Sequence, residues 1–229
     1  MKMYYTTVGI FKLKRQEKNN VYPVVILGGN ECQLDVQEMM IWSSLNWRIL
    51  NATQLRTYYE EMEKKSNFIC SRSYEDALNR LINRGLISVG IGESDEDALY
   101  NLISKLYIVP LYQNIFVRIF SFLKLYVLFN VPYEKSKVLF ERDKKTKTEK
   151  RIMELAFAAP MSTAEMIKCV DRDIDFIQSE DDIMEFLYDD ETVTSDTIAE
   201  TSKRLPTARN VVAAISNLYL RRQILFERI

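Results

Sequence analysis

The strongest constraint on the fold is an apolar stripe of helical period that runs directly into a strand-like segment. The stripe consists of Tyr74, Ala77, Leu78, Leu81 and Ile82. This spacing places all five side chains on one face of an α-helix. Ser73 and Asp76 form a variant of the capping box, and Gly85 suits a C-terminal cap. The pattern predicts a helix over 73–84, followed by a strand over 86–89.

Similar patterns extend to both sides of this pair of elements. Apolar residues four apart predict a helix over 35–50, and a second, shorter helix is expected over 53–64. Gly90-Ile91-Gly92 is interpreted as the tip of a turn after the strand. Ser94 then begins a helix that runs to about residue 106. The order is therefore three helices, a strand, a turn and a helix.

Strand signals are confined to short segments. Residues 4–13 and 21–27 are rich in β-branched and aromatic side chains and predict two strands, which can pair as a short N-terminal β-hairpin. The whole chain of 229 residues contains only 6 Gly and 5 Pro, which leaves little turn chemistry for an all-β fold. We expect a mainly α fold of the α+β class.

The order of elements over residues 31–107 resembles the winged helix-turn-helix superfamily. The resemblance implies that the third helix, 73–84, enters the major groove of DNA while the following turn contacts the backbone. It rests on the sequence of elements and names no particular family. Glu75 and Asp76 at the start of this helix depart from the pattern, because their negative charges would repel DNA phosphates.

A second unit of the same kind is expected over residues 147–229. It comprises a helix over 147–158, a helix that starts at the capping box of Ser162 and Glu165, and a helix from Pro206-Thr207. Residues 171–200 between them are acidic and have room for one helix, and residues 224–226 form a strand. Residues 81–87 align without gaps on residues 219–225, which supports two related units.

The middle of the chain connects these units. Residues 114–130 predict an apolar helix that forms a homodimer interface or is buried, and residues 134–151 form a basic linker. The expected domains are N-terminal strands at 1–30, a first unit at 31–107, the central helix and linker at 108–146, and a second unit at 147–229. The apolar helix is too short and too charged to span a membrane.

Residue types exclude much enzyme chemistry. The chain has no histidine, and Cys32, Cys70 and Cys169 are far apart with no CxxC spacing. The commonest general base and zinc ligand is therefore missing, and so is a thiolate metal site. We expect a non-catalytic, cytoplasmic protein without metal or cofactor. The scattered, odd number of cysteines suits a reducing compartment.

Arginine and asparagine on the two third helices are the candidate DNA-reading groups, because they pair with base edges in the major groove. The expected DNA-binding residues are Ser73, Asn79, Arg80, Asn83, Arg84, Lys203, Arg204, Thr207, Arg209, Asn210, Asn217, Arg221 and Arg222. Residues 203–229 carry six basic side chains against one acid. A regulator of transcription that binds duplex DNA is the first hypothesis.

Two alternatives remain open. The same polar residues also fit a solvated helix face, and Arg221 and Arg222 could serve the helix dipole or pair with the acidic stretch at 171–200. The second function hypothesis is a non-catalytic adaptor that uses acidic winged-helix domains to bind protein partners, with 171–200 as one binding surface. The sequence pI of about 5.8 favours it.

Overall fold

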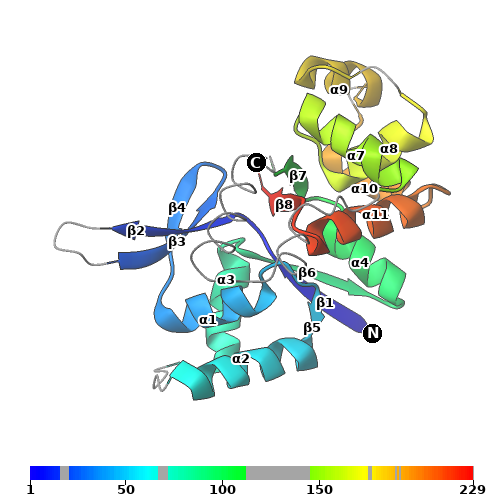
Figure 1. Ribbon diagram of the computed structural model, residues 1–229. Helices are drawn as coiled ribbons and strands as arrows, with labels where there is room; N and C mark the ends of the chain where they lie inside the picture. The colour runs from blue at the N-terminus through cyan, green and yellow to red at the C-terminus, as the bar shows by residue number, and fades with distance from the viewer. Residues whose placement is uncertain are drawn as a thin grey trace, which may run out of the picture.

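The computed structural model describes residues 1–15, 21–66, 72–111, 145–174, 177–188, 190 and 192–228. The central apolar helix expected at 114–130, its dimer interface and residues 134–144 of the basic linker lie outside these ranges. Within them the chain has an α+β fold of helices and small antiparallel sheets, as the sequence predicts (Figure 1).

The described strands form three sheets. Their bounds are β1 Lys2–Thr7, β2 Ile10–Arg15, β3 Val21–Leu27, β4 Asn30–Gln33, β5 Leu50–Asn51, β6 Ile87–Gly92, β7 Tyr107–Pro110 and β8 Ile224–Glu227. The strand orders are β5-β1-β6, β2-β3-β4 and β7-β8, with every pairing antiparallel.

The described helices are mostly short and capped. Their bounds are α1 Val36–Leu45, α2 Ala52–Ser66, α3 Tyr74–Asn83, α4 Asp95–Ile103, α7 Lys147–Ala158, α8 Thr163–Asp171, α9 Glu180–Leu187, α10 Ser195–Ser202 and α11 Ala208–Leu220. The stripe on α3 and the capping box of α8 are confirmed. The acidic stretch contains two helices, α9 and α10, and the expectation of one was wrong.

The N-terminal segment supplies strands to two different sheets. Residues 4–13 were expected to form one strand, but the chain breaks at Gly9, which has φ 89°. A Cβ at Gly9 would lie 2.5 Å from the carbonyl oxygen of Ile26, so only glycine fits this bend. β1 therefore becomes the central strand of the first sheet, while β2 pairs with β3 as the expected hairpin.

The Gly90-Ile91-Gly92 segment is not a turn tip, contrary to the sequence interpretation. It continues β6 and pairs with β1, where Gly92 lies opposite Lys2. The glycines serve helix packing instead, because α4 lies directly against β6. A Cβ at Gly90 would be 2.2 Å from the carbonyl oxygen of Ala98 and 2.4 Å from the nitrogen of Leu102.

A similar order of elements occurs twice, with α9 and α10 inserted between α8 and α11 in the second occurrence. In the first repeat, which we define as β1, α1, β5, α2, α3 and β6, the first strand lies between the other two. In the second repeat, β7, α7, α8, α11 and β8, the strand β7 pairs with β8 and makes an antiparallel bridge from Tyr107 to Ser162. Ser162 thus takes the position that β5 has in the first repeat.

Helix caps match between the repeats as well. Asp35 and Glu38 form a capping box at α1, as Thr146 and Glu149 do at α7. Asn51 exchanges hydrogen bonds with Gln54 at the start of α2, as Ser162 does with Glu165 at α8. The interval from Asp35 to Asn51 equals the interval from Thr146 to Ser162.

The ends of α3 and α11 also match, one residue away from the alignment made on sequence. Gly85 has φ 73° and Arg222 has φ 58°, so these two left-handed residues are equivalent. The next amide closes each helix, from Leu86 to the carbonyl of Leu81 and from Gln223 to that of Leu218. The sequence alignment placed Gly85 on Gln223 because it matched the apolar residues that precede and follow the polar corner in each segment.

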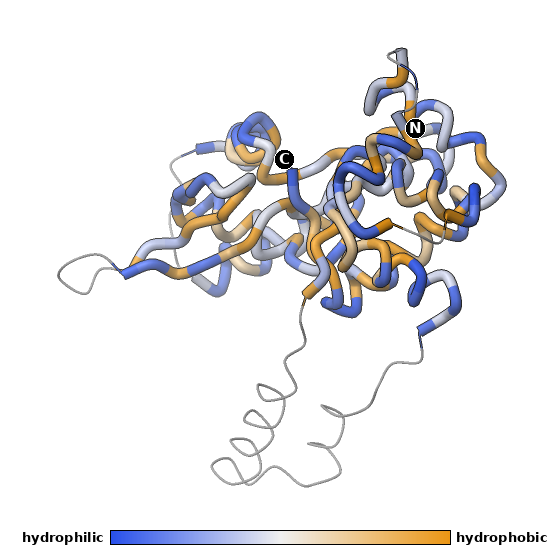
Figure 2. The backbone as a smooth tube through the Cα atoms, turned by 90° about the horizontal axis from the view of Figure 1, so that it is seen from above, coloured by the Kyte–Doolittle hydropathy of each residue, from blue (hydrophilic) through white to orange (hydrophobic). Residues whose placement is uncertain are grey.

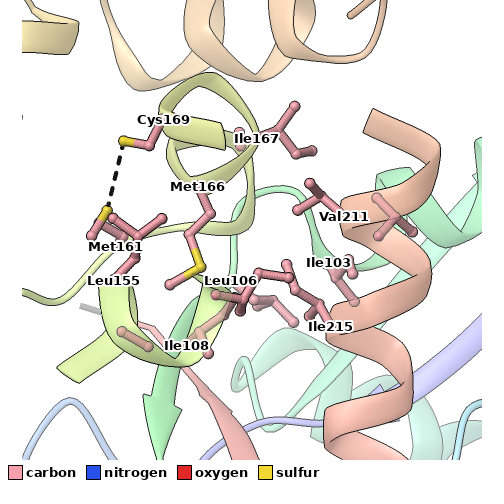
Figure 3. Packing of buried hydrophobic residues seen from close by; sticks show 14 of the residues in the cluster. Ile103, Leu106, Ile108, Leu155, Met161, Met166, Ile167, Cys169, Val211 and Ile215 are labelled. Atoms are coloured by element: carbon pink, nitrogen blue, oxygen red, sulfur yellow. Dashed lines mark hydrogen bonds between the residues drawn. The ribbon is translucent and has the colours of Figure 1, made fainter. Parts of the chain in front are cut away.

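Two apolar cores lie under these elements, and α4 joins them. One core gathers residues of the first repeat, including Trp42, Leu55 and Leu81. The other gathers α7, α8 and α11 together with Ile103 and Leu106 from the α4 region. Figure 3 shows Ile103, Leu106, Val211 and Ile215 meeting in this second core. The helix α4 therefore holds the second repeat against the first sheet.

Candidate nucleic-acid interface

The helix α11 carries an exposed face without carboxylates. Its buried side includes Val211, Ile215 and Leu218, which are fully buried. The exposed positions of the helix are Arg209, Asn210, Ala213, Asn217 and Leu220. No Asp or Glu occurs within the helix. Arg221 and Arg222 follow this face at the C-terminal end, so its polar groups are amides and cations.

The N-terminal end of α11 is tied to α4 by ion pairs. Arg209 Nη2 lies 2.7 Å from Glu96 Oε1, and Lys203 Nζ lies 3.1 Å from Asp97 Oδ1. The hydrogen bond from Lys203 lowers the pKa of the Asp97 carboxyl, with a further contribution from Ser94. Thr207 donates a hydrogen bond of 2.9 Å to Asp171 Oδ1. These three candidates already have partners within the chain.

The remaining cations near α11 differ in their contacts. Arg221 Nη1 lies 3.4 Å from Oε1 of Glu149, whose side chain is buried. Arg204 and Arg222 are exposed and form no ion pair with any carboxylate in the described ranges. Four polar side chains therefore lie on α11 or at its ends without an ion pair or side-chain hydrogen bond in the described ranges. They are Arg204, Asn210, Asn217 and Arg222.

The helix α3 presents a different surface. Arg80 Nε lies 3.0 Å from Oε1 and Arg84 Nη1 lies 2.9 Å from Oε2 of the buried Glu38. Arg84 also donates a 2.6 Å hydrogen bond to the carbonyl of Gln33. Both arginines thus contribute to packing between α3, α1 and β4.

The rest of the α3 face is polar but not basic. Ser73 caps the helix and bonds Asp76, while Asn79 and Asn83 are exposed. Glu75 is exposed on the same helix and pairs with Arg56 at 3.1 Å. Because Glu75 and Asp76 occupy the first turn, this face carries acids on the helix itself, whereas α11 contains no Asp or Glu.

Sequence reasoning missed a further basic surface, the ribbon of β2 and β3. Lys12, Lys14 and Arg15 lie within four residues of β2, and Lys12 and Arg15 are exposed. Lys14 forms an ion pair with Glu31 of β4. Figure 2 shows the ribbon projecting from the body of the molecule. The basic residues between Lys12 and Arg15 could have revealed this surface from the sequence. They were used only to assign a strand, and their charge was not considered.

Other kinds of site find no support within the described ranges. No group of three or more His, Cys, Asp or Glu side chains is arranged to hold a metal ion there. None of the helices in that part of the chain is both long and apolar enough to cross a membrane. Comparison of the chain with protein-family models, curated proteins and solved structures found no match.

Proposed function

We propose that the protein binds duplex DNA through α11 and regulates transcription, with its two repeats acting as winged-helix-like units. The observation that carries the proposal is the carboxylate-free exposed face of α11 and the cations at its ends. Asn210 and Asn217 can pair with adenine edges, while Arg204 and Arg222 can neutralise phosphates. The acids on α3 make it the weaker of the two reading helices.

DNA that binds to α11 must compete with the two ion pairs at the start of this helix. Lys203 and Arg209 are exposed, with side chains 38 % and 76 % accessible, so phosphate oxygens can reach them. Exposed pairs of this kind contribute about 0–1 kcal/mol each, which a phosphate contact readily replaces. Asp97 and Glu96 therefore lower the affinity for DNA without blocking the surface.

Salt dependence of binding tests the proposal. Fluorescence anisotropy of a labelled duplex, measured over a salt series, gives the slope of log affinity against log salt concentration. Replacing Arg204 with Ala should reduce the magnitude of that slope by about 0.9, because one phosphate contact is lost. The matched control is Lys64→Ala, which removes an exposed charge from the end of α2. It should leave the slope unchanged.

An adaptor that binds protein partners is the second candidate, and a specific observation favours it. On the acidic helix α9, Met184 and Phe186 are 57 % and 39 % exposed, among Glu180, Asp181 and Glu185. Such side chains are typical of contacts with a basic, apolar partner. If the protein binds no duplex at about 10 µM and low salt, the DNA proposal fails and the adaptor becomes the leading candidate.

A further inference from the structure

The ribbon of β2 and β3 is a basic surface that DNA binding by α11 leaves unused. Lys12 and Arg15 are exposed, and neither forms an ion pair within the part of the chain that the structure describes. Lys14 pairs with Glu31, which is the one acid among the described residues of this sheet. The ribbon and its neighbour β4 therefore carry three cations against one carboxylate.

The outer part of the ribbon has only two strands. β2 pairs with β3 along its whole length, from Ile10 opposite Ile26 to Arg15 opposite Val21, whereas β4 pairs only with residues 24–27 of β3. The cations at residues 14 and 15 lie beyond the edge of β4, on the part that projects from the body (Figure 2). The major groove of B-DNA is about 12 Å wide and admits a two-stranded ribbon, while the minor groove is about half as wide.

The cations of β2 lie on both faces of the ribbon. Successive side chains of a strand point to opposite faces, so Lys12 and Lys14 share one face and Arg15 lies on the other. A groove of duplex DNA has a phosphate backbone on each side and complements both faces at once. A membrane surface presents its charge on one side only. The ribbon therefore fits a groove better than a flat anionic surface.

Exposed apolar side chains accompany Arg15. Leu13 and Val21 lie on the same face as Arg15 and are 61 % and 51 % exposed. The edges of thymine bases offer methyl groups in the major groove, and apolar side chains make contact with them there. This face thus combines a cation for phosphate with apolar groups for base edges.

The base of the ribbon is held by the strand that follows α11. The amide of Gly9 donates a 2.8 Å hydrogen bond to the carbonyl of Phe226, and the amide of Gly28 donates one of 2.8 Å to a carboxylate oxygen of Glu227. Both acceptors belong to β8. The two bends that begin and end the ribbon are therefore anchored close to the end of α11.

This anchoring sets how far the ribbon reaches from α11. β8 has four residues and β2 has six. Laid end to end at about 3.3 Å per residue, the two strands span about 33 Å. That length is close to one turn of duplex DNA, at roughly 34–36 Å. A duplex that lies on α11 therefore continues within reach of the ribbon.

We propose that the β2–β3 ribbon lies in the major groove of the duplex that α11 binds, with Lys12 and Arg15 contacting phosphates of opposite strands. The proposal rests on DNA binding by α11 and adds a second contact surface. Because β8 holds the base of the ribbon, both surfaces are positioned before DNA binds, and the ordering cost of a free arm is avoided.

The salt dependence of binding measures this contact. The probe is a labelled duplex of about 30 base pairs, almost three helical turns, followed by fluorescence anisotropy. The double variant Lys12→Ala/Arg15→Ala should reduce the magnitude of the log–log salt slope by about 1.8, because two phosphate contacts are lost. The matched control Lys64→Ala/Lys65→Ala removes two exposed cations from the end of α2 and should leave the slope unchanged.

Single variants test the placement in a groove. Lys12→Ala and Arg15→Ala remove cations from opposite faces, so each should lower the magnitude of the slope by about 0.9. An effect of only one of them shows that a single face touches DNA and overturns the groove placement. Circular dichroism checks that each variant is folded.

The remaining outcomes separate the ribbon from α11. If Arg204→Ala lowers the slope while the double ribbon variant matches its control, the ribbon proposal is overturned and binding by α11 stands. If only the ribbon variant lowers the slope, the ribbon contact stands and the assignment to α11 fails. If the parent binds no duplex at about 10 µM and low salt, both are overturned.

An anionic membrane is the other partner to test. Vesicles containing phosphatidylserine should not bind the parent in a sedimentation assay. Vesicle binding that disappears in Lys12→Ala/Arg15→Ala, together with an unchanged DNA slope, would identify the membrane as the partner of the ribbon and overturn the proposal.

Discussion

Arg84 at the end of α3 contacts the buried carboxylate of Glu38 at the start of α1, with Nη1 and Oε2 2.9 Å apart. Glu38 Oε2 also accepts a 3.1 Å hydrogen bond from the amide of its own N-cap residue, Asp35. In the second repeat Arg221 contacts Glu149 at 3.4 Å, and Glu149 accepts from the amide of Thr146. In each repeat, therefore, one carboxylate caps the N-terminus of a helix, α1 or α7, and also contacts the arginine at the C-terminal end of another, α3 or α11.

Replacing Glu38 with Gln should destabilise the protein by about 1–3 kcal/mol, because hydrogen bonds to a charged group are lost and its arginine partners stay uncompensated. Glu149→Gln should cost less, since Arg221 is 40 % exposed and its contact is longer. Urea unfolding monitored by circular dichroism measures both. A larger loss for Glu149→Gln would show that the two carboxylates do not have equivalent roles.

Gly90→Ala should destabilise the fold by about 1–3 kcal/mol, as expected for overpacking. The new methyl group would lie 2.2 Å from the carbonyl oxygen of Ala98, so α4 must move away from β6. Gly29→Ala is the comparison, because it has open space around it and only a left-handed backbone, with φ 77°. Thermal unfolding should rank Gly90→Ala as the more damaging; equal losses would mean that α4 does not pack closely on this strand.

Substitutions of Arg209 and Leu218 test the exposed and the buried faces of α11 separately. Arg209→Ala should change stability by less than about 1 kcal/mol, since its exposed pair with Glu96 is screened by solvent. It should weaken specific DNA binding by about 1–3 kcal/mol. Leu218→Ala should cost about 2–5 kcal/mol of stability, because the side chain is fully buried. The measurements are anisotropy for DNA and thermal unfolding for stability.

The result that contradicts this assignment is a sharp fall in melting temperature for Arg209→Ala, with DNA affinity lost only through unfolding. Arg209 would then be structural. Its partner in the structure is Glu96 on α4.

Cys169 should be inert to alkylation and should make the fold sensitive to alkali. Burial raises the pKa of its thiol to about 12, and the side chain contacts Met161 in the core (Figure 3). The unfolded thiol ionises near pH 8.5. Its stabilising contribution is therefore complete below about pH 8.5 and is lost as pH rises towards 12, by roughly 2 kcal/mol at pH 10.

Comparing the parent with Cys169→Ala isolates this effect. The difference in free energy of unfolding between the two proteins should shrink as pH rises from about 8 to about 10. Iodoacetamide at pH 8, followed by mass spectrometry, should modify the partly exposed Cys32 well before Cys169. Equal labelling rates would show that the second core opens readily.

Local patterns in the sequence located most of the helices. The 3.6-residue stripe of α3 and the capping residues Ser73, Ser94 and Ser162 are local signals, and each marks a helix start in the structure. Strand ends were harder to locate. Gly90 was interpreted as a turn residue because nothing nearby in the sequence indicates that α4 packs across it.

The candidate site shows the same division between features that local sequence reveals and features that depend on distant contacts. The sequence pointed to the cations near α11 as a group, because they are close along the chain. It could not identify which of them are already engaged, since Glu96 and Asp97 are more than one hundred residues away from Arg209 and Lys203. The contact between Trp47 and Tyr219 was equally invisible, because these two rings meet only through folding.

The sequence by itself determined most of the helix starts and the amphipathic faces, since these follow from period and capping within a few residues. Only the tertiary structure decided that β1 completes the first sheet, that α4 joins the two repeats, and which carboxylate each arginine contacts. Those outcomes depend on pairing across long stretches of chain. Their free energy comes from burial and charge contacts that local sequence does not encode.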